Sequence, residues 1–344
     1  MTASPIGVAN YELSPGSLGE MLEWLIRARR PGMVWGPPGV GKSDVIRAVA
    51  AKLGMIYIDL RALLFDPVDL KGIPSLENGK TTWNIPDFLP DFDSEDLYLI
   101  VIEELPAASH SVQMAFYQLI LDRKLEKYTL PHGAYIMACG NNQQDRGVWN
   151  KLPPALASRM IHVDVKVDVQ DWLLCAEEND ISLEIRWFMM YKSELLHQYD
   201  PQKNTGEFGF PCPRTWKFID DLYKESGSVS SNIELAGYRG TIGQGAAVEF
   251  TGFLQVCRQL PHLQTIIDDP QNADVPPDPQ VLIATCGGLY RMANEYNFDS
   301  IITYAERLRP ELGQYLVSSS VRNNKELQYT KNYVSWNASH GGNR

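Results

Sequence analysis

The stretch Gly36–Ser43, which reads GPPGVGKS, decides the fold of this chain. It fits the pattern G-x-x-x-x-G-K-[ST], a loop whose backbone N–H groups surround phosphate groups. The apolar residues 32–35 precede it, as in a buried strand, and residues 44–53 follow with apolar side chains at helical spacing. Strand, glycine-rich loop and helix in this order are the context in which the motif binds phosphate. The sequence therefore predicts a nucleotide-binding α/β domain.

Each residue type in this loop has a physical reason. The glycines let the N–H groups turn inward, Lys42 reaches the β- and γ-phosphates, and Ser43 offers a hydroxyl to Mg²⁺. The positive end of the following helix dipole points at the same anion. A glycine–proline turn that matches by chance is the alternative, and the flanking patterns disfavour it. With ATP and Mg²⁺ as cofactors, the residues predicted to bind the nucleotide are Gly36, Pro37, Pro38, Gly39, Val40, Gly41, Lys42, Ser43 and Asp44.

The composition is that of an ordinary globular protein. The 344 residues suggest about two domains, and 44% hydrophobic with 21% charged residues is typical of such chains. A net charge of −11 argues against a general nucleic-acid-binding surface. The five cysteines have no zinc-site spacing, which predicts idle thiols in a reducing compartment. With no signal-peptide pattern and no apolar run of about 18 residues, we expect a cytoplasmic protein without a membrane partner.

Two carboxylates follow the most hydrophobic strand candidate. Residues 97–102 read LYLIVI, and Glu103 and Glu104 come directly after them. This is the Walker B pattern, in which the first carboxylate organises Mg²⁺ and the second polarises the attacking water. Glutamate replaces the usual aspartate at the first position, so the sequence leaves the efficiency of hydrolysis open.

Further polar residues lie between and after the predicted strands. The strand 134–139 is followed by Asn141, an amide that can orient water against a γ-phosphate, although an Asx-type turn is the alternative. Residues 65–90 fit either a hairpin about Asn78 and Gly79 or an interrupted helix. For residues 125–132 the sequence predicts only a short, hairpin-like segment.

Strand and helix patterns alternate up to residue 167, and helical patterns follow. This predicts a parallel sheet flanked by helices, then an all-helical lid domain and a helical C-terminal extension. The predicted boundaries are 1–167, 168–225 and 226–344, with residues 335–344 frayed. The glycine-rich residues 237–246 lack a preceding strand and predict no second nucleotide site. A helix is expected only from about residue 248.

The ordered set of motifs GPPGVGKS, LIVIEE, ACGNNQ, LPPALASRM and FPCPRTW resembles that of AAA+ ATPases, and most closely the MoxR branch. The resemblance covers residues 32–222, and the C-terminal part is similar to a MoxR-like subgroup found in bacteria and phages. It implies hydrolysis of ATP to ADP and phosphate in a homo-hexameric ring. It also implies a chaperone that remodels a partner, generally a protein with a von Willebrand factor A domain, and assigns contacts at the ring's pore to residues 65–90.

The resemblance also implies a role for each matching residue. Lys42 and Ser43 are Walker A, Glu103 and Glu104 are Walker B, and the metal is held at Ser43 and Glu103. The implied catalytic residues are Glu104, Asn141 as sensor 1, Arg159 as the finger reaching a neighbour's ATP, and Arg214 as sensor 2 on the lid.

Several alternatives stay open. Arg146 is a rival for the trans-acting role, and Arg159 could instead form a local salt bridge. Arg214 could instead pair with Asp220 or Asp221. A nucleotide-gated scaffold with weak hydrolysis is the alternative function that Glu103 suggests, and a DNA-engaging motor is disfavoured by the net charge of −11.

Overall fold

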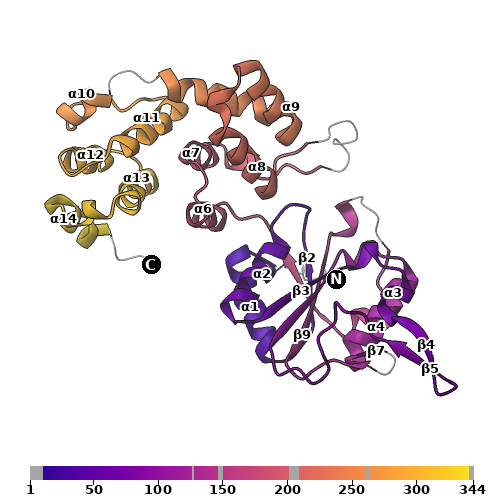
Figure 1. The fold of residues 1–344 in the computed structure, drawn as a ribbon. Coiled ribbons are helices and arrows are strands. Elements are labelled where there is room, and N and C mark those ends of the chain that lie inside the picture. The colour runs from indigo at the N-terminus through magenta and orange to yellow at the C-terminus, as the bar shows by residue number, and fades with distance from the viewer. Residues whose placement is uncertain (1–10, 126–127, 146–149, 201–208, 260–262, 341–344) are drawn as a thin grey trace, which may run out of the picture. The chain divides into compact units, whose positions relative to one another are not determined.

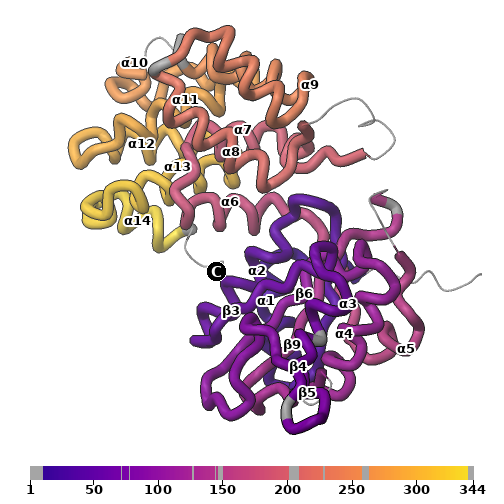
Figure 2. Tube along the Cα trace, turned by 45° about the vertical axis from the view of Figure 1, so that its right-hand side comes forward, coloured from indigo at the N-terminus to yellow at the C-terminus, as the bar shows by residue number. Residues whose placement is uncertain are grey.

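The computed structural model describes residues 11–125, 128–145, 150–200, 209–259 and 263–340 (Figures 1 and 2). The chain divides into two compact units. The first comprises residues 1–172 and 197–215, and the second comprises residues 173–196 and 216–344.

A six-stranded parallel sheet forms the centre of the first unit. Its strands lie in the order β1 (Glu12–Leu13), β10 (Ile161–Val165), β2 (Gly32–Trp35), β9 (Ala134–Gly140), β6 (Tyr98–Glu103) and β3 (Ile56–Arg61). Because all six strands run in the same direction, the carboxyl ends of β2, β9 and β6 meet at one edge of the sheet. Ligands of such sheets bind at this edge.

Helices cover both faces of the sheet (Figure 1). α1 (Pro15–Arg27) and α2 (Lys42–Lys52) pack on one face, where the β6 side chains Leu99 and Val101 point. The other face carries Ile100 and Ile102 of the same strand. It is covered by α3 (Pro67–Lys71), α4 (His110–Asp122) and α5 (Pro154–Ala157). Burial of both faces explains why β6 reads as an uninterrupted apolar run rather than an alternating one.

The predicted α/β fold, a parallel sheet flanked by helices with a helical C-terminal part, is confirmed. The strand β1 was not predicted, because two residues are too short for a periodic pattern. α1 is capped by Ser14, whose hydroxyl accepts a hydrogen bond from the Ser17 N–H.

Residues 65–90 contain an antiparallel hairpin of β4 (Ile73–Glu77) and β5 (Lys80–Asn84), which extends away from the sheet (Figure 1). Asn78 and Gly79 at its tip have φ angles of 50° and 73°, as a two-residue hairpin turn requires. The hairpin alternative is therefore the correct one. A second, very short ladder pairs β7 (Lys124–Leu125) with β8 (Tyr128–Thr129). Short 3₁₀ helices in this unit are Ala62–Leu64, Leu105–Ala107 and Gln143–Asp145, and those of the second unit are Ser193–Leu195, Ser226–Ser228 and Lys325–Tyr329.

The second unit is built of helices, with no strand among its described residues, and α6 (Val169–Glu178) leads into it. Phe188, Trp216, Phe250 and Phe253 pack together in its core. α10, α12 and α14 lie one beside the next (Figures 1 and 2). The helices are α7 (Leu183–Tyr191), α8 (Pro213–Lys224), α9 (Ser231–Gln259), α10 (Leu263–Asp268), α11 (Pro279–Met292), α12 (Phe298–Ala305), α13 (Pro310–Asn323) and α14 (Lys331–His340).

Two expectations about this unit are wrong. The glycine-rich residues 237–246 are helical, because they belong to α9, which is broken only by a kink at Gly243. Each glycine costs a helix about 1 kcal/mol, but every fourth side chain from Tyr238 to Leu254 is buried, and that packing outweighs the cost. Residues 335–340 are helical rather than frayed, since Trp336 is buried and stacks on Tyr333. No helix in the described ranges is long and apolar enough to cross a membrane.

Candidate nucleotide-binding site

A pocket of about 390 Å³ lies at the carboxyl edge of the sheet. From the predicted phosphate loop it takes Pro38, Gly39, Gly41, Lys42 and Ser43. Glu103, Glu104, Asn141 and Arg214 also line it. Four segments far apart in the sequence therefore meet at the end of the sheet where parallel strands bind ligands.

The loop between β2 and α2 depends on its glycines. Gly39 and Gly41 have φ angles of 78° and 95°, in the left-handed region that disfavours other residues. A Cβ atom at Gly39 would also lie 2.4 Å from the Cys212 sulfur. Gly41 is the N-cap of α2, which begins at Lys42, so the positive end of this helix faces the pocket.

Lys42 is almost fully buried at the centre of the site, with 8% of its surface exposed. Its ammonium group donates to the carbonyl oxygens of Gly36 (2.8 Å) and Pro37 (3.0 Å) and to Oδ1 of Asn141 (3.0 Å). Burial lowers the pKa of Lys42, and nearby acidic groups, Glu104 and Glu103 among them, oppose that shift. All three acceptors are neutral, so a phosphate oxygen would offer the ammonium a stronger, charged partner.

Glu103, the last residue of β6, is oriented by two hydrogen bonds. The Tyr57 hydroxyl donates to its Oε1 at 3.4 Å, and the Cys139 thiol donates to its Oε2. Burial raises the pKa of the Cys139 thiol well above its usual range, and the Glu103 carboxylate adds to this, so the thiol keeps the proton that it donates. This pair of donors fixes a side chain that is one methylene longer than the usual aspartate.

The oxygen donors in the pocket fit Mg²⁺. Ser43 supplies a hydroxyl and Glu103 a carboxylate, and both line the same pocket. Across the described residues, no three His, Cys, Asp or Glu side chains are grouped so that they could hold a metal by themselves. A magnesium ion here would therefore take its remaining ligands from phosphate and water, as it does in phosphoryl-transfer sites.

Glu104 and Asn141 are brought together by a close backbone approach. Glu104 has φ 55° and ψ 32°, a left-handed conformation that costs a non-glycine residue about 1–3 kcal/mol. Gly140 ends β9 against the turn that follows Glu104, and a Cβ atom there would lie 2.4 Å from Cδ of Pro106. The left-handed backbone at Glu104 and the lack of a side chain at Gly140 together place the Glu104 carboxylate and the Asn141 amide in one pocket.

Arg214 lines the pocket from the first turn of α8. Its backbone N–H lies 3.4 Å from the Gly39 carbonyl oxygen, which ties this turn to the phosphate loop. The alternative pairing with Asp220 or Asp221 is wrong, because these acids pair with Lys217, and Asp220 also pairs with Lys224. Arg214 is thus a cation beside the loop without an acidic partner in the described part of the chain.

Sequence reasoning missed three residues that line this pocket: Arg47, Asp59 and Arg61. Asp59 and Arg61 contact each other at 3.4 Å, and the Arg47 guanidinium lies 4.8 Å from the centre of the Tyr57 ring. A signal for two of them was present, since Asp59 and Arg61 alternate around Leu60 at the carboxyl end of β3. Polar residues at that end of a parallel strand face the ligand edge.

The structure does not bring every predicted residue into this pocket. Arg159 immediately precedes the β10 region and therefore lies toward the opposite, amino edge of the sheet, where it lines a different pocket. It donates to the Ser158 hydroxyl at 3.0 Å, and the local salt bridge suggested for it is absent from the described residues. Arg146 lies outside them. The remaining predicted residues, Gly36, Pro37, Val40 and Asp44, belong to the loop and α2 but do not line the pocket.

The sequence matches no protein-family model and no curated protein. Among solved structures it is similar to NtrX from Brucella abortus, at 12% identity over 93% of this chain and 69% of that one, with a TM-score of 0.39. A structure of that protein in complex with ADP matches at 14% identity over 95% and 68%, with a TM-score of 0.34. A RuvB mutant from Thermotoga maritima matches at 15% identity over 76% and 79%, with a TM-score of 0.37. These likenesses are distant, and the function proposed below rests on the residues of the site.

Proposed function

We propose that this chain is an AAA+ ATPase of the MoxR type, which binds ATP with Mg²⁺ and hydrolyses it to ADP and phosphate. One observation carries this proposal. A single pocket at the carboxyl edge of the sheet gathers the phosphate loop, the two carboxylates at the end of β6, the amide after β9 and the cationic Arg214. Phosphoryl transfer needs such groups, because enzymes catalyse it almost entirely by positioning the reactants and stabilising the charge on the phosphate.

Each side chain has a defined task in this proposal. Lys42, Arg214 and the loop N–H groups would bind the phosphate oxygens, while Ser43 and Glu103 would hold a magnesium ion. Glu104 would accept a hydrogen bond from the attacking water, and Asn141 would orient that water toward the γ-phosphate. When bound, the magnesium ion would supply positive charge to the phosphate group.

The position of Arg159 supports catalysis between copies of the chain. Residue 159 and the phosphate loop lie toward opposite edges of the sheet, and β2, four residues long, spans about 13 Å between those edges. Arg159 is therefore badly placed for a nucleotide on its own loop and well placed, at the surface, for that of a neighbour. A ring, hexameric in this proposal, closes such head-to-tail contacts.

The proposed task of the ring is to remodel a partner protein, such as one with a von Willebrand factor A domain. The hairpin of β4 and β5 suits such contacts, because Ile73 and Leu76 leave 71% and 81% of their surfaces exposed. In this proposal residues 168–225 are the lid domain and residues 226–344 an extension. Nucleic acid is not part of this proposal.

Lys42→Ala is expected to abolish ATP hydrolysis, because it removes the buried ammonium that meets the phosphates. Phosphate release by the purified chain is measured with ATP and Mg²⁺. Binding of a fluorescent ATP analogue is measured in parallel. Lys52→Ala is the matched control, since Lys52 lies at the other end of α2 and pairs with Glu23 at the surface. Hydrolysis that survives Lys42→Ala would refute the proposed site.

A nucleotide-gated scaffold with weak hydrolysis is the second candidate, and the hydrogen bonds that hold Glu103 favour it. A carboxylate that accepts from Tyr57 and Cys139 has fewer lone pairs available for the waters of Mg²⁺.

Glu103→Asp distinguishes an efficient ATPase from a nucleotide-gated scaffold with weak hydrolysis. If hydrolysis is limited by this side chain, the substitution should raise magnesium-dependent turnover several-fold without changing ATP affinity. If the wild type already turns over efficiently, the shorter side chain should leave the rate unchanged or lower it. Turnover measured against magnesium concentration distinguishes these outcomes, and the second one rejects the scaffold.

A further inference from the structure

Residues 197–215 belong to the first unit, although the chain on both sides of them belongs to the second. Their described parts are 197–200 and 209–215, and a hydrogen bond of 2.9 Å from the Gln198 N–H to the Pro211 carbonyl oxygen joins the two. We call these two parts the strap. The strap supplies three hydrogen bonds to the phosphate loop and to the turn that follows β9.

Two of these hydrogen bonds occupy carbonyl oxygens of the phosphate loop. Nε2 of His197 lies 3.1 Å from the Pro38 carbonyl oxygen, and the backbone nitrogen of Arg214 lies 3.4 Å from that of Gly39. The two carbonyl oxygens before these accept from the Lys42 ammonium. A carbonyl oxygen repels an anion, and here four consecutive ones have partners in the protein. The N–H groups of the same loop are thereby left to face a phosphate.

His197 is the donor in its contact, because a carbonyl oxygen can only accept. Burial lowers the pKa of His197, so the ring is neutral at pH 7 and its single proton is on Nε2. Phe210, from the other part of the strap, lies edge-on to the imidazole, with 6.5 Å between the ring centres. The Cys212 sulfur fills the space beside Gly39. Packing within the strap and against the loop therefore holds the imidazole in place.

Tyr199 ties the strap to the turn that follows Asn141. Its hydroxyl donates to the Asp145 carbonyl oxygen at 2.6 Å, and its ring packs 4.8 Å from that of Phe210. Asp145 is buried and closes the turn, because its carboxylate accepts from the Asn142 N–H at 2.9 Å. The Asp145 N–H also donates to the Asn142 carbonyl oxygen at 3.0 Å. The strap thus fixes the turn at whose start the Asn141 amide enters the pocket.

We infer that His197 and Tyr199 are positioning residues of the nucleotide site with separate tasks, an inference that rests on the proposed function. Neither is among the described residues that line the pocket, and each acts through a group that lines it, Pro38 or Asn141. His197 keeps a loop carbonyl away from the anion, so its loss weakens binding of ATP and ADP alike. Tyr199 keeps the amide aligned, so its loss slows the chemical step and leaves binding intact.

Calorimetric titration with ADP and Mg²⁺ tests the task of His197. His197→Leu should weaken binding roughly 10-fold, because the Pro38 carbonyl oxygen loses its donor. His197→Gln is the matched variant, since the glutamine Nε2 can take the place of the imidazole Nε2, and it should bind nearly as well as the wild type. Unchanged affinity of His197→Leu would overturn the assignment. Equally weak binding by both variants would do so too, because the ring would then contribute packing rather than a donor.

Tyr199→Phe removes a single hydroxyl and should lower kcat at least about 10-fold without changing the affinity for ADP, because small errors in orientation slow a reaction strongly. Tyr98→Phe is the matched control. The Tyr98 hydroxyl lies 2.9 Å from that of Ser94, at the start of β6 and away from the pocket. A kcat equal to that of the control would overturn the role of Tyr199. A loss of ADP affinity as large as the loss in kcat would also overturn it.

Failure of this inference and failure of the proposed function give different results. Wild-type protein that binds neither ATP nor ADP would overturn the proposed function and the two positioning roles together. Wild-type protein that binds and hydrolyses ATP, with His197→Leu and Tyr199→Phe behaving in the same way, would overturn the positioning roles alone.

Discussion

Glu104→Gln is expected to lower ATP turnover at least about 100-fold while ATP and Mg²⁺ remain bound, because general-base assistance typically contributes that much. The substitution removes the charge that polarises water but keeps the size of the side chain and its hydrogen-bonding reach. The backbone at residue 104 is left-handed in either case, so no new strain is introduced. The readouts are phosphate release under saturating ATP and retention of labelled ATP on the protein.

Glu95→Gln is the control for this prediction, since Glu95 is an exposed acid shortly before β6 and outside the pocket. It should leave turnover unchanged. If Glu104→Gln retained a rate within a few-fold of the wild type, the water would have to be polarised by another carboxylate in the pocket. Asp59, at the carboxyl end of β3, would then be the residue to substitute next. The same variant would also trap ATP-bound rings and so identify the partner protein that copurifies with them.

Arg159→Gln is expected to lower turnover roughly 1000-fold, the low end of what an arginine supplied by a neighbour contributes. Affinity for ATP and the temperature of unfolding should not change, because the side chain is exposed and its guanidinium donates to the hydroxyl of the adjacent Ser158. An equal mixture of Arg159→Gln and Lys42→Ala proteins should recover turnover. If the two proteins assemble at random, about one quarter of the contacts between subunits bring an intact phosphate loop together with an intact Arg159.

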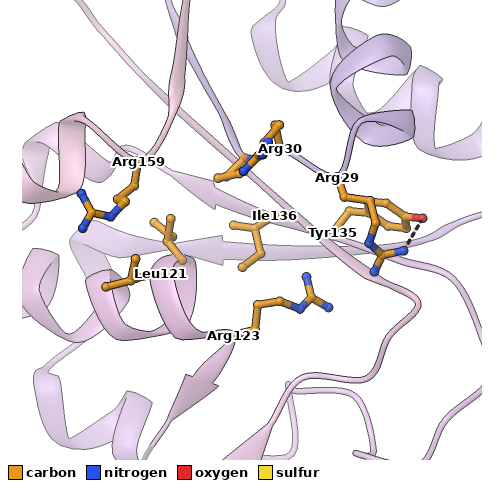
Figure 3. Close-up of a pocket in the computed structure, with 9 residues that line it drawn as sticks. Arg29, Arg30, Leu121, Arg123, Tyr135, Ile136 and Arg159 are labelled. Atoms are coloured by element: carbon orange, nitrogen blue, oxygen red, sulfur yellow. Dashed lines mark hydrogen bonds between the residues drawn. The ribbon is translucent and has the colours of Figure 1, made fainter.

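Two results would contradict the prediction for Arg159. One is normal turnover by the Arg159→Gln protein in assembled rings. The other is a mixture that stays inactive although both proteins assemble together, which would place the arginine's effect within its own subunit. Arg30→Gln tested alongside separates the predicted finger from Arg30, which lines the same pocket toward the amino edge of the sheet (Figure 3), because the finger alone should account for most of the loss.

The local structure of the first unit could be predicted from sequence because each element has its own pattern. The strand at residues 32–35 directly precedes the phosphate loop, and β6 is an apolar run ended by carboxylates. Asn78 and Gly79 made a hairpin possible, since residues that tolerate positive φ form such turns, but the sequence left an interrupted helix open as well. Where no local pattern existed, as in the two-residue β1, the prediction was missing.

The helical unit shows the limit of local propensity. The glycine-rich composition around Gly240 and Gly245 predicts an irregular segment. These residues belong to helix α9 because Tyr238, Ile242 and Phe250 are buried on one side of that helix. Which side chains become buried is set by helices distant in the chain. A short stretch of sequence therefore does not show which of its side chains will be buried.

By itself, the sequence determined the elements around GPPGVGKS and the residue types that ATP and Mg²⁺ need, because spacing and side-chain chemistry are local properties. Only the tertiary structure decided which of those residues meet. The order of the strands placed Lys42, Glu103 and Asn141 at one edge, and it placed Arg159 at the other with three arginines that no motif had marked. Strand order depends on burial between segments far apart in the chain, and this long-range packing separates Arg159 from the nucleotide site of its own chain.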